Sequence, residues 1–173
     1  MEILSKFSTL FLFLFLPITL LMHYVMQEEY RNYWLLMASL IFFAWSQPSY
    51  LWILLLNVAI NYTGALMIAY IKKFRKLFLG IAAGANLALL FYFKYFNFVL
   101  TTISKLIRFN CDVKNIVLPI GISFFTFQGM SYVIDVYRRD VPVQKNIIKL
   151  ALYITLFPQL VAGPIVRYTD IAA

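Results

Sequence analysis

A polar stripe runs through an otherwise apolar part of the sequence, residues 118–139. Gln128, Tyr132, Asp135 and Arg139 follow one another at steps of four, three and four residues, so a helix would place them on one face. A charged side chain at the centre of a bilayer costs about 2.5 to 3.5 kcal/mol on insertion scales. We therefore expect the stripe to face other helices or a wet cavity, and not lipid.

Two kinds of chemistry are open to these side chains. Gln128 and Tyr132 could line a substrate path or contact a donor, and the alternative is that they only form hydrogen bonds between helices. A desolvated Asp135 could act as a general base. Arg139 lies four residues further on, however, and an ion pair between the two is the role that we favour for Asp135.

The last apolar segment combines helix-breaking residues with polar ones. Pro158 and Pro164 each remove a backbone donor, and Gly163 allows backbone torsions that other residues avoid. The carbonyls that this frees need partners, so we expect the segment to be buried in protein or beside a cavity. Gln159 is a further candidate for a substrate path. Arg167 could hold a phosphate or a carboxylate, or it could mark the headgroup region.

Asparagines and one lysine interrupt other apolar segments. Asn57 and Asn61 share a helix face, and hydrogen bonding between helices is the role that we favour for them and for Asn86. Lys94 lies within an aromatic run. Its side chain could extend to the membrane surface, or it could contact a bound anionic group.

The composition indicates the class of protein. Of the 173 residues, 63% are hydrophobic and 13% are charged, whereas about a quarter are charged in soluble proteins. Apolar segments of about the length that crosses a bilayer recur along the chain, and in the fourth of them Gly80 and Gly84 would let another helix approach closely. The segments lie at about 7–26, 32–47, 49–71, 77–100, 116–134 and 147–166. We predict an all-α, polytopic integral membrane protein embedded in the lipid bilayer.

Other classes of protein do not fit the charged and metal-binding residues. The net charge of +8 comes from short clusters between apolar segments, so binding to nucleic acid is not expected. One cysteine and one histidine exclude an internal disulfide and a multi-histidine metal site within this chain, and we expect no bound metal or cofactor. The histidine, His23, lies in the first apolar segment, where packing or an interfacial position is the role that we favour.

The basic clusters also predict an orientation. The densest cluster follows the third apolar segment, and the positive-inside rule places it in the cytoplasm. This predicts an external N-terminus. The basic residues inside are then Arg31, Lys72, Lys73, Arg75, Lys76, Arg138, Arg139 and Lys145, and those outside are Lys6, Lys105, Arg108, Lys114 and Arg167.

Several stretches resemble a known family. LPIGISFFTFQGMSYVIDVYR at 118–138 and ALYITLFPQLVAGPIVRY at 151–168 resemble the membrane-bound O-acyltransferase superfamily, in particular its branch like the alginate O-acetylation membrane protein. RNYWLLMASLIFFAW at 31–45 and LLFYFKYFNF at 89–98 are similar to the N-terminal half of that branch. The resemblance therefore covers nearly the whole chain.

The resemblance implies a fold of many helices around a tunnel through the membrane. An acyl group, here acetyl, would pass from a cytoplasmic acyl-CoA or acylated carrier protein to a hydroxyl of an extracytoplasmic polysaccharide or related cell-envelope acceptor, in a bacterial inner membrane. Such an attack needs a general base, and the family's catalytic histidine lies beyond the equivalent of Arg167. The resemblance thus implies that this chain is the N-terminal part, carries no catalytic residue and is inactive without the C-terminal half.

Two other functions stay open. Broken helices with inward polar groups are also how transporters and flippases build binding sites, although no repeat is apparent between residues 1–86 and 87–173. The chain could also be a non-catalytic membrane scaffold whose partner is an extracytoplasmic acyltransferase.

Overall fold

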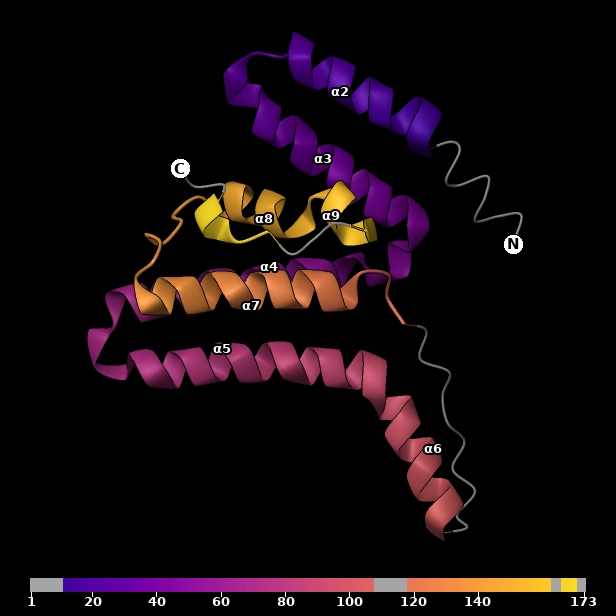
Figure 1. Ribbon diagram of the computed structural model, residues 1–173, viewed down its shortest axis with the longest axis vertical. Helices are drawn as coiled ribbons and strands as arrows, with labels where there is room; N and C mark the ends of the chain where they lie inside the picture. Colours follow the sequence, from indigo (N-terminus) through magenta and orange to yellow (C-terminus); the bar gives the residue numbers. More distant parts are fainter. Residues whose placement is uncertain (1–10, 108–117, 163–165, 171–173) are drawn as a thin grey trace.

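The computed structural model describes residues 11–107, 118–162 and 166–170, and all regular structure among them is helical (Figure 1). This confirms the predicted all-α class. The longer helices are α2 (Leu16–Val25), α3 (Glu28–Ser46), α4 (Leu51–Tyr70), α5 (Arg75–Leu90), α6 (Phe96–Ile107), α7 (Ile122–Arg138), α8 (Ile147–Thr155) and α9 (Phe157–Ala162). The short turns between them are η1 (Phe11–Phe15), η2 (Pro48–Tyr50), η3 (Lys72–Phe74), η4 (Phe91–Tyr95) and η5 (Tyr168–Asp170).

Helices α4, α5 and α7 pack against one another and form the centre of the structure (Figure 1). Ile53, Leu54 and Ile68 of α4 are fully buried there, together with Phe125 of α7. Helix α8 packs against both α3 and α4, and α2 packs against α3. The polar stripe on α7 therefore lies in the most enclosed helix contact of the described chain.

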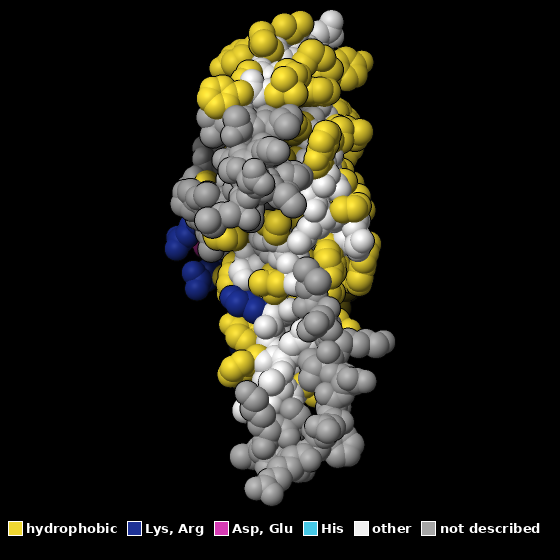
Figure 2. Space-filling model, turned by 90° about the vertical axis from the view of Figure 1, so that its right-hand side faces the viewer, with side chains coloured by type: hydrophobic (Ala, Val, Ile, Leu, Met, Phe, Trp, Pro, Cys, Tyr) yellow, Lys and Arg dark blue, Asp and Glu magenta, His cyan; other side chains and the backbone are white. Residues whose placement is uncertain are grey.

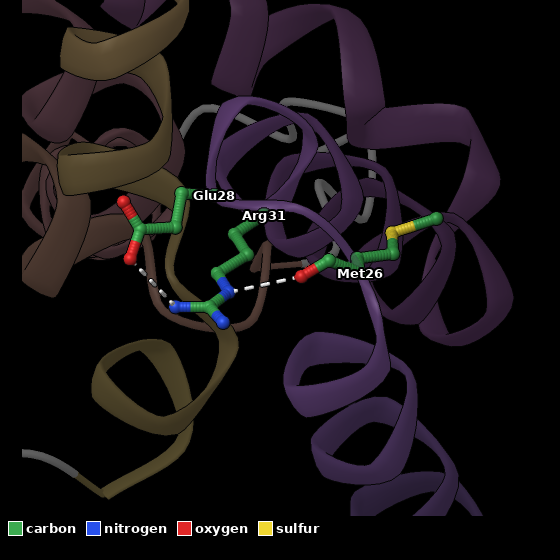
Figure 3. Close-up of polar contacts among 3 residues, drawn as sticks. All are labelled: Met26, Glu28 and Arg31. Atoms are coloured by element: carbon green, nitrogen blue, oxygen red, sulfur yellow. Dashed lines mark hydrogen bonds and ion pairs between the residues drawn. The ribbon is translucent and has the colours of Figure 1, made fainter.

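Polar contacts of the α3 side chains fix the outer helix pair. Arg31 Nε donates a hydrogen bond of 3.1 Å to the Met26 carbonyl, and Arg31 Nη1 lies 3.9 Å from Glu28 Oε1 (Figure 3). Trp34 Nε1 donates to the carbonyl of Thr19 on α2 at 3.1 Å. Arg31 thus satisfies a carbonyl at the end of α2, and Trp34 contacts a carbonyl nearer its start.

The fourth apolar segment bends where one helical turn is wider. The π-helical turn η4 joins α5 to α6, and α6 leaves the bundle at an angle (Figure 1). A π-helical turn holds one more residue than an α-helical turn, so side chains beyond it change face. The prediction of a helix over 77–100 is confirmed, but the helix is not straight.

The last apolar segment is broken, as the prolines predict. Leu156 separates α8 from α9 with an extended ψ of 116°, and Pro158 lies in the first turn of α9. Proline disfavours helical torsions in the residue before it but fits the first turn of a helix. Phe157 N donates to Ser39 Oγ of α3 at 3.4 Å, so the break is held against α3.

Two helical stretches of the described chain are long and apolar enough to cross a membrane by length and composition, Pro48–Tyr70 and Lys72–Thr102. Viewed from the side opposite the α4–α5 turn, most of the coloured side chains are hydrophobic (Figure 2). Many large hydrophobic side chains are exposed, among them phenylalanines, leucines and tryptophans, and such a surface fits contact with lipid better than contact with water. These observations support a membrane protein.

Candidate functional site

Gln128 is the side chain that ties the three C-terminal helices together. It is 2% exposed, and its Nε2 atom donates to the carbonyl of Tyr153 on α8 at 2.9 Å and to Gln159 Oε1 on α9 at 2.6 Å. The structure therefore brings Gln128 and Gln159 into direct contact. Because the Gln128 donor is used within the chain, its observed role is to hold the α8–α9 break beside α7.

Tyr132 lies one turn further along α7, in a cluster of three tyrosine rings. Its ring is fully buried and lies 5.0 Å from the ring of Tyr168, which in turn lies 5.0 Å from the ring of Tyr153. The Tyr132 hydroxyl accepts a hydrogen bond of 2.9 Å from the backbone N–H of Gln144. Gln144 Nε2 donates to the Tyr168 hydroxyl at 2.8 Å, and the Tyr153 hydroxyl donates to the Val166 carbonyl at 2.8 Å.

Asp135 and Arg139 differ from the predicted arrangement. Asp135 is buried, with 7% of its surface exposed, but Arg139 ends α7 in a left-handed conformation with φ 69° and an exposed side chain. Arg139 therefore lies beyond the regular helix that the spacing assumed. The inward stripe consists of Gln128, Tyr132 and Asp135, and the pairing of Asp135 with Arg139 stays a prediction.

The three asparagines form a second buried cluster, as their favoured role predicts. Asn57 Nδ2 donates to Asn86 Oδ1 at 2.7 Å, and Asn86 Nδ2 donates to Asn61 Oδ1 at 2.9 Å. All three side chains are fully buried between α4 and α5. Gly129 of α7 lies directly against the Asn61 amide. This cluster is interhelical hydrogen bonding that holds α4, α5 and α7 at close range.

Lys94 and Arg167 lie apart from the Gln128 contacts. Lys94 is exposed on η4, where its Nζ atom donates to Ser123 Oγ at 3.4 Å and lies 5.6 Å from the centre of the Tyr95 ring. Arg167 is exposed just before η5. Both side chains remain available to an anionic ligand, whereas Gln128 and Tyr132 are hydrogen-bonded inside the chain.

The hollows on the described surface are lined by other residues. A groove of about 830 Å³ lies between the start of α3 and the start of α8, and its lining includes Glu28, Glu29 and Lys149. A hollow of about 440 Å³ lies beside the α4–α5 turn and the end of α7. A third, of about 380 Å³, lies on α5 and η4. None of these three hollows is lined by Gln128.

No group of metal-ligating side chains is found in the described part of the chain. His23 on α2 lies against the Tyr24 ring, with the ring centres 5.9 Å apart. It is far along the sequence from the polar stripe, and α2 contacts α3, not α7. The structure thus gives His23 no partner for acid–base chemistry with the stripe.

Sequence reasoning missed Gln144, Tyr153 and Tyr168, which complete the tyrosine cluster. Gln144 and Tyr168 lie outside the long helices, so the helical repeat does not predict the direction in which their side chains point. Two tyrosines within an apolar terminal segment were the available signal, because a buried tyrosine hydroxyl usually finds a hydrogen-bond partner.

The sequence is similar to those of several bacterial proteins. It is 40% identical to the probable alginate O-acetylase AlgI of Pseudomonas aeruginosa over 95% of this chain and 33% of that protein. It is 40% identical to the same-named protein of Pseudomonas putida over 95% of this chain and 35% of that protein. It is 31% identical to the peptidoglycan O-acetyltransferase of Helicobacter pylori over 94% of this chain and 37% of that protein. No family model and no solved structure matches the chain.

Proposed function

Since the chain is related to the alginate O-acetylases over 95% of its length, we propose that it forms part of a membrane O-acetyltransferase for a cell-envelope polysaccharide. The chain spans about a third of the length of those relatives. The observation that carries the proposal is this relationship, which includes a peptidoglycan O-acetyltransferase as well as alginate O-acetylases. The names of these relatives share one reaction, the O-acetylation of a polysaccharide.

The proposed reaction takes acetyl from a cytoplasmic thioester, either acyl-CoA or an acylated carrier protein. The acceptor hydroxyl oxygen attacks the thioester carbonyl, a C–O bond forms, the C–S bond breaks, and the thiol leaves. A general base must take the hydroxyl proton. We place that base in the part of the relatives that this chain does not cover, because the resemblance to the membrane-bound O-acyltransferases places their catalytic histidine beyond the equivalent of Arg167.

The chain's own contribution is a scaffold with a fixed break. Gln128 holds the junction of α8 and α9 to α7 through two hydrogen bonds. The asparagine cluster joins α4 to α5, and Gly129 of α7 packs directly against it. Irregular backbone at membrane depth is tolerated where it is buried in protein or lines a cavity. We propose that this break forms one wall of the acetyl path, in a bacterial inner membrane with the N-terminus outside.

Deletion of the complete gene that encodes this chain in its host tests the proposal. Acetyl esters are then quantified by proton NMR on the exported polysaccharides and on peptidoglycan. We expect one of these polymers to lose its acetyl esters and to regain them when the gene is returned. Unchanged acetylation of every envelope polymer would overturn the proposal and leave a transporter or flippase as the alternative. If the deletion removes the acetyl esters and addition of a purified extracytoplasmic acyltransferase restores them without this chain, the scaffold role would be favoured.

A further inference from the structure

The hollow beside the α4–α5 turn is lined by three basic side chains and no acidic one. Lys72 of η3, Arg75 at the start of α5 and Arg139 after α7 face a volume of about 440 Å³. The remaining lining is Ala69, Val136, Val141, Pro142 and Val143. The α4–α5 turn and the end of α7 lie side by side at one edge of the structure (Figure 1). We propose that this hollow binds the phosphate group of an amphiphilic or extended ligand.

Arg75 is held in place to serve such a site. Its Nη2 atom donates to the carbonyl of Tyr137 at 2.6 Å and to that of Val136 at 3.4 Å, and its guanidinium lies 5.3 Å from the centre of the Tyr137 ring. Its Nε atom is buried and has no hydrogen-bond partner among the described residues. These contacts fix the guanidinium beside the hollow, where a charged hydrogen bond to an anion is stronger than one between neutral groups.

The backbone on both sides of the hollow favours an anion. The helical stretch that continues from η3 into α5 begins here at Lys72, and no side-chain cap is present at Ile71 or Phe74, so the positive end of the helix dipole lies near the hollow. Near the negative end of α7, Arg75 donates to the carbonyls of Val136 and Tyr137. Asp140 is exposed next to Arg139 but does not line the hollow. Three positive charges therefore remain without a carboxylate among the lining residues.

Arg139 occupies a backbone position that glycine would fill at lower cost. Its φ is 69°, and the Asp140 N–H bonds back to the Asp135 carbonyl at 3.0 Å, the pattern of a helix that ends with a left-handed residue. A side chain at such a position is disfavoured, because its Cβ comes too close to the following carbonyl oxygen. The C-terminal dipole of α7 gives a purely structural reason for a cation there. Binding of a phosphate gives a functional reason for the same cation, and an experiment can distinguish the structural reason from the functional one.

The purified chain in detergent micelles can be tested with two probes in about 0.15 M salt. Inorganic pyrophosphate represents a soluble phosphate compound, and its binding is followed by thermal unfolding. Phosphatidylglycerol represents a lipid headgroup, and phosphatidylcholine is the comparison lipid. The number of molecules of each lipid that the protein retains is counted by native mass spectrometry. The double variant Lys72→Gln with Arg139→Gly is compared with Lys73→Gln with Lys76→Gln, which removes the same charge from lysines that do not line the hollow.

We expect the Lys72/Arg139 double variant to bind about ten-fold more weakly and the control to bind like the original chain, because hydrogen bonds to charged groups are the strong ones. Loss of pyrophosphate binding alone identifies a soluble phosphate ligand, and loss of phosphatidylglycerol retention alone identifies a headgroup. Equal loss in both double variants, or no binding of either probe, would overturn the proposal. The single variant Arg139→Gly should unfold at a higher temperature while binding falls, a combination that a purely structural arginine would not give. None of these readouts depends on acetyl transfer.

Discussion

Gly129 on α7 lies against the Asn61 amide of α4, and the space between them does not admit a methyl group. Gly129→Ala would force the buried asparagine cluster apart. We expect a loss of about 1 to 3 kcal/mol in stability, the usual cost of overpacking. Thermal unfolding of the purified chain in detergent measures it.

Gly80→Ala and Gly84→Ala provide matched controls. A Cβ on either residue meets nothing within 4 Å, so these variants should unfold at the same or a slightly higher temperature. If Gly129→Ala were as stable as these two, the described packing of α7 on α4 would be incorrect. The glycine pair predicted to admit another helix has no such helix against it in the described chain.

Asn86 supplies the oxygen to which both Asn57 and Asn61 donate, at 2.7 and 3.2 Å. Asn86→Leu leaves those two amides without that acceptor in a fully buried place. We expect a loss of about 1 to 3 kcal/mol, because unsatisfied buried donors are more costly than the hydrogen bond is favourable. Asn32→Leu is the comparison, since Asn32 lies at the edge of an open groove. Similar unfolding temperatures for the two variants would contradict the cluster.

At the scale of elements, two hydrogen bonds from Gln128 join α7 to α8 and α9 on either side of their break. Gln128→Ala and Gln159→Ala should each destabilise the chain, and the double variant should lose less than the sum of the two. A coupling of about 0.5 to 3 kcal/mol is usual for residues in contact. The cycle is measured by denaturant unfolding in mixed micelles.

Gln128→Ala combined with Gln47→Ala is the control cycle. Gln47 Oε1 accepts from Ile120 N at 2.8 Å and shares no partner with Gln128. These two changes should add within about 0.5 kcal/mol. Additive behaviour in the Gln128–Gln159 cycle as well would show that the 2.6 Å contact contributes nothing to holding the break.

The sequence allows the helices to be predicted better than their bends. Continuous apolar runs and the prolines at 48 and 158 place most helix ends within a few residues. The π-helical turn at Phe91–Tyr95 adds one residue inside an unbroken aromatic run, and hydropathy does not change there. Arg139 illustrates the other limit: regular spacing placed it on the stripe, but the helix ends one residue earlier.

At the scale of the whole molecule, the basic residues of the α2–α3 turn, the α4–α5 turn and the end of α7 predict the cytoplasmic side. Ser49→Cys and Lys73→Cys lie at opposite ends of α4 and can be introduced one at a time after Cys111→Ser. A membrane-impermeant maleimide added to intact cells should label Cys at position 49 and not at 73. Labelling of both from one side would contradict the proposed orientation.

The candidate site was predictable in part. Burial of Gln128 and Tyr132 follows from the cost of polar groups in lipid, and Gln159 follows from the breaks around it. The tyrosine cluster depends on residues 144 and 168 in irregular segments, whose position only the folded chain fixes. For Lys94 and Arg167 the sequence allowed either a position at the membrane surface or contact with an anionic ligand. Both side chains are exposed, which is compatible with either role.

The central claim is that this chain is part of an enzyme that moves acetyl from a cytoplasmic thioester to a polysaccharide. Inside-out membrane vesicles that contain the complete gene product and enclose the host's polysaccharide test it directly, with ¹⁴C-acetyl thioester added outside. The account predicts label in the enclosed polymer, in amounts that follow the quantity of inserted protein. The vesicles receive labelled acetyl-CoA and labelled acetylated carrier protein in turn. If the protein is correctly inserted and the polymer stays unlabelled with both donors, the account is contradicted.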